Sequence, residues 1–271
     1  MSTVRMKTAE AAVAGRPSPS IWGDCPIAEM LLNSAKGLYI FEDFHSGIVA
    51  DATLVLGQRH GLVGYVDSDQ AADVALQSDE KGVIKLDQDG TDDDVTVVTT
   101  GDNVTGLVKV TSGDQKKMWF EARVKLSTIT DGDLAAFIGL TEEGQAADGK
   151  PLGAAGAIGD IDHIGFSVKE DDGDALELAY TKAGQADATP VALATLVADT
   201  YVRLGLKFEP LDNKVHVYVD GVEIKDAAIS AAATNFPSGE KLAVTFAIAS
   251  GANGADGDGM YVDWFCVAQE Y

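Results

Sequence analysis

Two aspartate-rich segments are the strongest candidates for chemistry in this sequence. The first, DQDGTDDD, spans residues 87–94, and the second, NGADGD, spans residues 253–258. Clustered carboxylates on flexible backbone suit calcium, which takes about six to eight oxygen ligands. Neither segment has the order of an EF-hand loop, and Asp and Gly also dominate ordinary turns. We therefore expect no cofactor, with calcium as the alternative and these candidate ligands: Asp87, Asp89, Asp92, Asp256 and Asp258.

No histidine or cysteine pattern suggests a metal centre or a nucleophile. His163 and His216 fall on the polar faces of predicted strands, where a solvated or cross-strand role is expected. Cys25 and Cys266 match no zinc or redox spacing, so we expect buried or free thiols. The sequence contains no Gly-x-Ser-x-Gly run and no phosphate-binding loop. We therefore expect no catalytic residue.

Two aromatic residues are candidates for stacking on sugar rings. Trp119 falls on the polar face of its predicted strand, and Tyr218 lies in a second strand. Large aromatic side chains are, however, mostly buried in folded proteins. We therefore favour a Trp119 that packs under a neighbouring loop or under the N-terminal residues, with glycan stacking as the alternative.

The charge and composition of the chain exclude several partners. Its 43 acidic and 20 basic residues give a formal net charge of −23 at pH 7. Such a surface repels phosphate backbones, so no nucleic-acid partner is expected. We attribute the acidity to solubility, with a basic partner or divalent cations as alternatives. No run resembles a signal peptide or a membrane span of about 18 apolar residues. We therefore expect no membrane partner and a protein that is made and kept in the cytoplasm, or assembled there into something larger.

Alternating apolar and polar residues predict β-strands from residue 118 onward. In 118–126 the apolar residues Met118, Phe120 and Val124 alternate with Trp119, Glu121 and charged residues. A period of two places the apolar set on one face and the charges in water. Further strands are predicted at 134–140, 163–169, 176–180, 191–196, 201–208, 214–219, 242–249 and 260–268. Short strands joined by polar turns predict an all-β sandwich.

The chain is predicted to have three parts. Residues 1–37 form an arm with a short helix at 27–36, because Pro17 and Pro19 hold the preceding backbone extended. Residues 38–116 form an irregular β-rich region, either part of the sandwich or a small subdomain. Its predicted strands lie at 38–41, 54–56, 83–86, 95–99 and 107–110. Residues 117–271 form the sandwich core.

The order of motifs from residue 118 resembles the concanavalin A-like lectin/glucanase superfamily. The matching runs are MWFEARV (118–124), FIGLT (137–141), HIGF (163–166), YVRLGLKFEP (201–210), VYVDGV (217–222) and YVDWF (261–265). The resemblance implies a jelly-roll antiparallel β-sandwich whose closing strand pairs with the first. More narrowly, the run is similar to virion structural proteins of tailed bacteriophages with this fold, including head decoration proteins.

The residues that glucanases of this superfamily use are missing from the sequence. Those enzymes carry Glu-x-Asp-x-x-Glu on one strand, so that two carboxylates flank the glycosidic bond. Here Glu121 and Glu177 are the outward strand acids nearest the required place, and neither has an acidic residue two positions further on. We therefore expect a protein that is not an enzyme.

The resemblance implies a capsid decoration or cement protein located on the capsid exterior of a virion. Its expected partners are the major capsid protein and further copies of itself in a homo-oligomer, by analogy a trimer. The arm would pack on its own domain or reach a neighbouring subunit, with these residues as candidate contacts: Arg16, Pro17, Pro19 and Trp22. The alternatives are a glycan-binding module of a phage tail or fibre and, third, a glycoside hydrolase.

Overall fold

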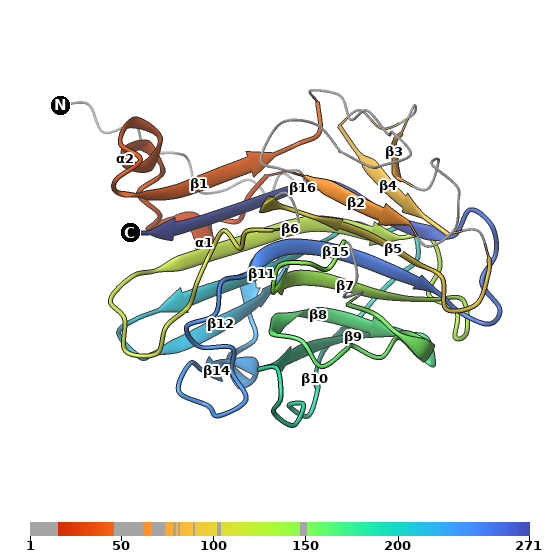
Figure 1. The fold of residues 1–271 in the computed structure, drawn as a ribbon. Coiled ribbons are helices and arrows are strands. Elements are labelled where there is room, and N and C mark those ends of the chain that lie inside the picture. Colours follow the sequence, from red (N-terminus) through yellow and green to blue (C-terminus); the bar gives the residue numbers. More distant parts are fainter. Residues whose placement is uncertain are drawn as a thin grey trace.

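The computed structural model describes residues 16–45, 62–66, 74–77, 80, 82–88, 90–101, 104–146 and 151–271. Across these residues the chain folds into two antiparallel sheets, A and B, stacked face to face (Figure 1). Two short helices, α1 (Pro19–Trp22) and α2 (Ile27–Leu32), lie beside one end of sheet A. The predicted all-β sandwich is therefore confirmed. Within the described ranges, no helix is long and apolar enough to cross a bilayer.

Sheet A contains nine of the described strands. Their order is β13-β12-β11-β6-β16-β4-β3, with β1 paired to β16 and β14 paired to β12. The bounds are β1 (Gly37–Glu42), β3 (Val74–Leu76), β4 (Ile84–Asp87), β6 (Met118–Leu126), β11 (Val202–Glu209), β12 (Lys214–Val219), β13 (Val222–Glu223), β14 (Ile229–Ser230) and β16 (Gly259–Glu270). The first strand thus pairs with the closing strand, as the resemblance implied.

Sheet B contains seven of the described strands, in the order β10-β9-β8-β7-β15-β5-β2. The bounds are β2 (Val63–Val66), β5 (Val95–Thr99), β7 (Leu134–Thr141), β8 (His163–Lys169), β9 (Asp172–Thr181), β10 (Val191–Thr195) and β15 (Ala243–Ser250). Two short 3₁₀ helices, η2 (Ala154–Gly156) and η3 (Lys225–Ala227), lie in connecting segments. All strands predicted from residue 118 onward are present.

The core lies between the sheets and consists of inward side chains from both. Phe120 on β6 and Leu206 on β11 meet Phe166 on β8 and Phe246 on β15 in one fully buried cluster. Each such side chain contributes roughly 1.5–3 kcal/mol relative to an exposed position. The two-residue period of the strands brings these groups to the same face, so packing of the sheets follows from the pattern.

The outer faces of the central strands are covered as well. On β7, Ala135 and Phe137 pack beneath Leu152 and Ile158 of the segment that follows. On β6, Trp119 and Glu121 are also fully buried. The prediction that the outward side chains of β6 lie in water is wrong for Glu121, because residues before β1 fold over that face of sheet A.

The region 38–116 is where local patterns were least informative. The predicted strands at 83–86 and 95–99 are present as β4 and β5, and β2 and β3 were not predicted. Residues 107–110 form an isolated bridge to Leu242 instead of a strand, and the prediction at 54–56 lies outside the described residues. Helix α2 ends before Lys36, because Asn33 has extended backbone with φ −146°.

The strands predicted at 201–208 and 214–219 form a hairpin, β11–β12, and a second tight turn follows it. Strands β11 and β12 pair with Glu209 opposite Lys214, and β12 then pairs with β13 through the two residues Asp220 and Gly221. Both have positive φ, 50° and 75°, as a type I′ turn requires. A Cβ on Gly221 would lie 2.7 Å from Ser18 Oγ, so the turn is in close contact with Ser18 of the N-terminal arm.

Gly221→Ala tests this double role against a matched control, Gly113→Ala. Both glycines have similar positive φ, 75° and 79°, but nothing lies within 4 Å of a Cβ on Gly113. Left-handed backbone alone costs an alanine about 1–2 kcal/mol. We expect urea unfolding to show this loss in both variants and a larger loss in Gly221→Ala, which also displaces Ser18. Equal losses would contradict a tight contact between turn and arm.

Candidate functional site

Of the predicted arm, the structure describes residues 16–36 before β1, and these residues, called the arm from here on, lie on the outer face of sheet A. Its buried side chains Ile21, Trp22 and Met30 pack on outward residues of the sheet. We call the resulting set the arm cluster; its buried members are Ile21, Trp22, Met30, Trp119, Tyr218, Trp264, Cys266 and Ala268. The arm therefore packs on its own domain, and it covers the aromatic part of this face.

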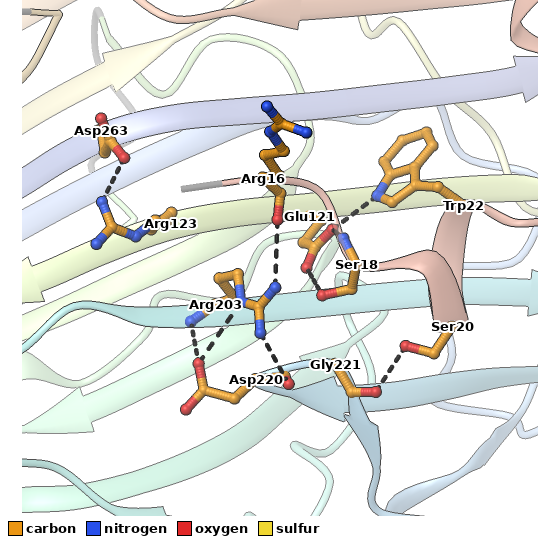
Figure 2. A network of polar contacts seen from close by, with 10 residues as sticks. All are labelled: Arg16, Ser18, Ser20, Trp22, Glu121, Arg123, Arg203, Asp220, Gly221 and Asp263. Atoms are coloured by element: carbon orange, nitrogen blue, oxygen red, sulfur yellow. Dashed lines mark hydrogen bonds and ion pairs between the residues drawn. The ribbon is translucent and has the colours of Figure 1, made fainter. Parts of the chain in front are cut away.

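Glu121 is the polar centre of this interface (Figure 2). Its Oε2 accepts hydrogen bonds from Ser18 N at 2.8 Å and from Trp22 Nε1 at 2.7 Å, and its Oε1 accepts one from Ser18 Oγ at 2.5 Å. All three donors belong to the arm. Burial raises the pKa of Glu121, and the bonds from Ser18 and Trp22 and the charge of Arg203 offset this only in part. The hydrogen bonds of this carboxyl group thus attach the arm to sheet A.

Arg203 on β11 fixes the other side of the arm. Its Nη1 donates to the Arg16 carbonyl at 3.2 Å, and its Nη2 donates to the Asp220 carbonyl at 3.1 Å. Ser20 Oγ donates to the Gly221 carbonyl at 2.6 Å. These contacts join the arm to the turn between β12 and β13 (Figure 2). Arg203 is nearly buried, so its guanidinium acts as an internal brace.

Asp24, between the two arm helices, makes the third attachment. Its carboxylate lies 2.7 Å from Lys117 Nζ and 2.9 Å from Lys207 Nζ, and it accepts a hydrogen bond from Trp119 Nε1 at 3.1 Å. Burial alone would raise the pKa of Asp24, but the bonds from Lys117, Lys207 and Trp119 outweigh it and lower the pKa to about 2. The carboxylate is therefore ionised throughout the neutral range.

The residues predicted to bind a neighbour are engaged within the chain. Trp22 is buried on its own sheet, and Arg16 offers its backbone carbonyl to Arg203. Pro19 begins α1, where its missing N–H costs nothing, and Pro17 is half-buried beside it. In this structure sheet A supplies the apolar surface that Trp22 needs, while Arg16 and Pro19 stay exposed, and contact of these residues with a neighbour stays a prediction.

The stacking platforms predicted for glycans are not available on the surface. Trp119 is fully buried, and Tyr218 is 8% exposed. The arm covers both rings, which is the packing that the sequence favoured for Trp119, so the alternative of glycan stacking has no exposed ring at these two positions. The thiols of Cys25 and Cys266 are free and lie beside the same cluster. Burial raises the pKa of Cys25 to about 12, so it is a poor nucleophile at neutral pH.

A hollow of about 180 Å³ lies on the outer face of sheet B. His163 and Ser167 of β8 and Thr181 of β9 line it, together with Ile158 and Asp187 from connecting segments. Thr181 Oγ1 donates to Asp187 Oδ1 at 2.9 Å. The hollow combines polar groups with apolar walls, which suits a small ligand rich in hydroxyl groups.

His163 differs from its prediction as a solvated residue. It is 2% exposed, its Nδ1 lies 2.9 Å from the Ile161 carbonyl, and its ring meets Phe137 edge-on. Burial lowers the pKa of His163, so the ring is neutral at pH 7. His216 has the predicted cross-strand role, since it contacts Glu223 on β13 at 2.7 Å and Asp212 at 3.0 Å.

The calcium candidates are only partly brought together. Asp92 lies with Asp93 and Glu170, with ligand oxygens within 4.8 Å of one another. Asp87 instead pairs with Lys85 at 2.8 Å. Asp258 accepts the Ala255 N–H, Asp256 lies in the adjacent exposed loop, and Asp89 lies outside the described residues. Three carboxylates supply about half of the oxygens that calcium takes, so calcium binding stays a prediction.

Comparison with known proteins identifies the architecture. No family model and no curated protein matches the sequence. Solved structures match the fold: the Emp47p carbohydrate recognition domain at 11% identity and TM-score 0.56, covering 87% of this chain and 95% of that one. Peanut lectin matches at 10% identity and TM-score 0.56, covering 87% of this chain and 98% of the lectin chain. The Bacillus licheniformis β-glucanase matches at 15% identity and TM-score 0.51, covering 84% of this chain and 97% of the glucanase chain.

The fold is the concanavalin-like jelly roll. This jelly roll is shared by lectins and by a glucanase, so at such identities it shows the architecture alone. The choice between binding and catalysis therefore depends on individual residues. The sequence analysis did not identify Ser18, Asp24 and Arg203 as functional residues. One local signal was available for Ser18, which lies between two prolines at the start of a helix that buries Trp22.

Asp24→Asn tests the ionic attachment of the arm. The low pKa of Asp24 means that its charge stabilises the docked arm above about pH 4, the ordinary range of an aspartate, and that this contribution disappears as the pH falls toward 2. We expect the variant to increase acrylamide quenching of tryptophan emission at pH 7. The difference from wild type should vanish near pH 2; a difference that persists there would contradict an ionic cause.

Proposed function

We propose that this chain is a non-enzymatic structural protein that coats the outside of a virus particle. The proposal depends on where the two outward strand acids, Glu121 and Glu177, lie in the structure. Glu121 is sealed beneath the arm, and Glu177 pairs with Lys169 at 2.9 Å. They lie on different sheets, so they do not flank a common substrate.

Glycoside hydrolysis needs two carboxyl groups that face one bond, separated by about 5 Å in retaining enzymes and up to about 9.5 Å in inverting ones. Neither Glu121 nor Glu177 meets this requirement. Glu142 and Asp162 do lie together in an exposed groove, where burial and the nearby Asp162 charge raise the pKa of Glu142. Glu142 Oε2 accepts the Asp162 N–H at 3.0 Å, so this pair is occupied in bracing the β7 and β8 ends.

The particle-coat part of the proposal draws on two further features. The motif order from residue 118 is similar to that of tailed-phage virion proteins, and the net charge of −23 favours a protein that stays dispersed at high concentration. The proposed partners are the shell protein and neighbouring copies, arranged around a closed rotational axis, by analogy a threefold one. The proposed location is the capsid exterior.

Immuno-electron microscopy tests the coat function. Antibodies against the chain are applied to intact particles purified from cultures that express it. We expect regular labelling of the outer shell, and loss of the protein from particles at a lower denaturant concentration than the shell itself. A protein found only in the soluble fraction, or a particle fraction with polysaccharide-degrading activity that depends on the chain, would overturn the proposal.

A glycan-binding module is the second candidate, and the hollow on sheet B favours it. Ser167, Thr181 and Asp187 offer hydroxyl and carboxylate groups beside the apolar Ile158 and Pro190. Such mixed lining matches the polar and apolar faces of a sugar ring. This hollow replaces Trp119 and Tyr218 as the candidate glycan site, since both rings lie under the arm.

A glycan array with two variants tests this second function. Asp187→Asn removes a charge from the hollow, while Asp171→Asn removes an exposed charge away from it. If the chain binds glycans there, Asp187→Asn is expected to reduce binding at least tenfold, the effect of losing one charged hydrogen bond of about 1.4 kcal/mol or more. Equal reduction by both variants, or no binding by the wild type, would rule the site out.

A further inference from the structure

The carboxyl group of Glu121 anchors the arm to sheet A. We infer that it makes the arm a proton-operated strap: residues 16–36 dock most tightly when Glu121 is protonated and loosen when it ionises, which uncovers an aromatic face of sheet A. Such a strap would operate whether or not the chain coats a particle.

Both protonation states of Glu121 can be hydrogen-bonded by the same three groups. Ser18 N and Trp22 Nε1 can only donate, so Oε2 must remain an acceptor. The Ser18 hydroxyl lies 2.5 Å from Oε1 and can either donate or accept. A proton on Oε1 can therefore donate to Ser18 Oγ, and Glu121 keeps all three of its contacts with the arm, while the Ser18 hydroxyl hydrogen turns away from it. The neutral carboxyl is fully accommodated in the buried site.

The ionised carboxyl, by contrast, has no cation of its own. The guanidinium of Arg203 donates to the backbone carbonyls of Arg16 and Asp220, and Arg123 pairs with Asp263 (Figure 2). The charged and titratable groups around Glu121 come from every element packed there: Arg123 on β6, Arg203 on β11, Asp220 after β12, Asp263 and Cys266 on β16, and Arg16 and Asp24 on the arm. Glu121 thus forms no ion pair with a described residue, and the charge of Arg203 and the hydrogen bonds from the arm offset the desolvation of the buried carboxylate only in part.

The direction of the pH effect follows from this geometry and from the raised pKa of Glu121. A free glutamate titrates near about 4.3. Docking is favoured most below that value and weakens as the pH rises through the higher pKa of the docked state. Each unit by which docking raises the pKa changes the docking equilibrium about tenfold. Asp24 stays ionised above about pH 4, so it adds a constant attraction over this range.

The arm has little structure that would survive release. Helix α1 has four residues and α2 has six, and neither has a side-chain cap hydrogen bond. Helices shorter than about 12 residues are marginal in water without tertiary contacts. The arm therefore has two states, docked and folded or detached and unfolded, and a change at Glu121 shifts the balance between them.

The face beneath the arm contains a group that gains from release. Trp264 Nε1 is buried and has no hydrogen-bond partner among the described residues. A buried donor without an acceptor destabilises the docked state. Detachment would expose this indole together with Trp119 and Tyr218, and water or an incoming acceptor would then satisfy it.

Tryptophan emission tests the strap directly. The chain has three tryptophans, Trp22, Trp119 and Trp264, and all of them lie in the arm cluster. We expect wild-type emission to move to longer wavelength, and acrylamide quenching to increase, between about pH 4.5 and pH 8. Glu121→Gln keeps an acceptor for Ser18 N and Trp22 and a donor for Ser18 Oγ. It is expected to hold the docked spectrum throughout.

Two further variants separate the strap from general pH effects. Glu177→Gln, on sheet B, should keep the wild-type pH response. Ser18→Ala removes a hydrogen bond from both protonation states, and the bond to the charged carboxylate is the stronger one, so this variant should steepen the loss of docking as the pH rises. It provides a second test should Glu121→Gln fold poorly. Far-UV circular dichroism confirms that sheets A and B remain folded. A wild-type signal that is flat with pH, or the same slope in Glu121→Gln or in Ser18→Ala, would overturn the inference.

Discussion

The structure depends on the burial of both faces of its central strands. A strand directs alternate side chains to opposite sides, and packing of two sheets covers only the inner side. Strands β6 and β7 carry Trp119 and Phe137 on their outer sides, so these sides also require a cover. The arm supplies it for sheet A, and the segment with Leu152 and Ile158 supplies it for sheet B. The described chain therefore has four layers: the arm, sheet A, sheet B and the segment with Leu152 and Ile158.

This layering determines where the molecule can interact. Covering sheet A removes Glu121 and Trp119 from solvent, although both stand on the polar face of their strand. The hollow beside His163 remains open, because the covering segment and the residues around Asp187 form its walls without filling it. Because the jelly roll is shared by lectins and a glucanase, the surfaces that this chain leaves open say more about its interactions than the fold does.

Two carboxylates attach the arm, and their surroundings give them opposite pH responses. Asp24 meets two lysines and an indole N–H, and its pKa falls to about 2. Glu121 is fully buried, and the hydrogen bonds from Ser18 and Trp22 and the charge of Arg203 do not outweigh its desolvation, so its pKa rises. The chemistry of the two side chains is nearly the same. Desolvation dominates for one and charge-assisted hydrogen bonding for the other.

The sequence by itself determined the all-β class and the positions of most strands from residue 118 onward, because two-residue alternation is a local signal. It also indicated the turn at Asp220 and Gly221, since few residues tolerate left-handed backbone. Only the tertiary structure decided that Ser18 would meet Glu121, 103 residues away, and that Glu170 would join Asp92 and Asp93. Such contacts depend on which outer face stays uncovered once the sheets have paired, and no local pattern records that.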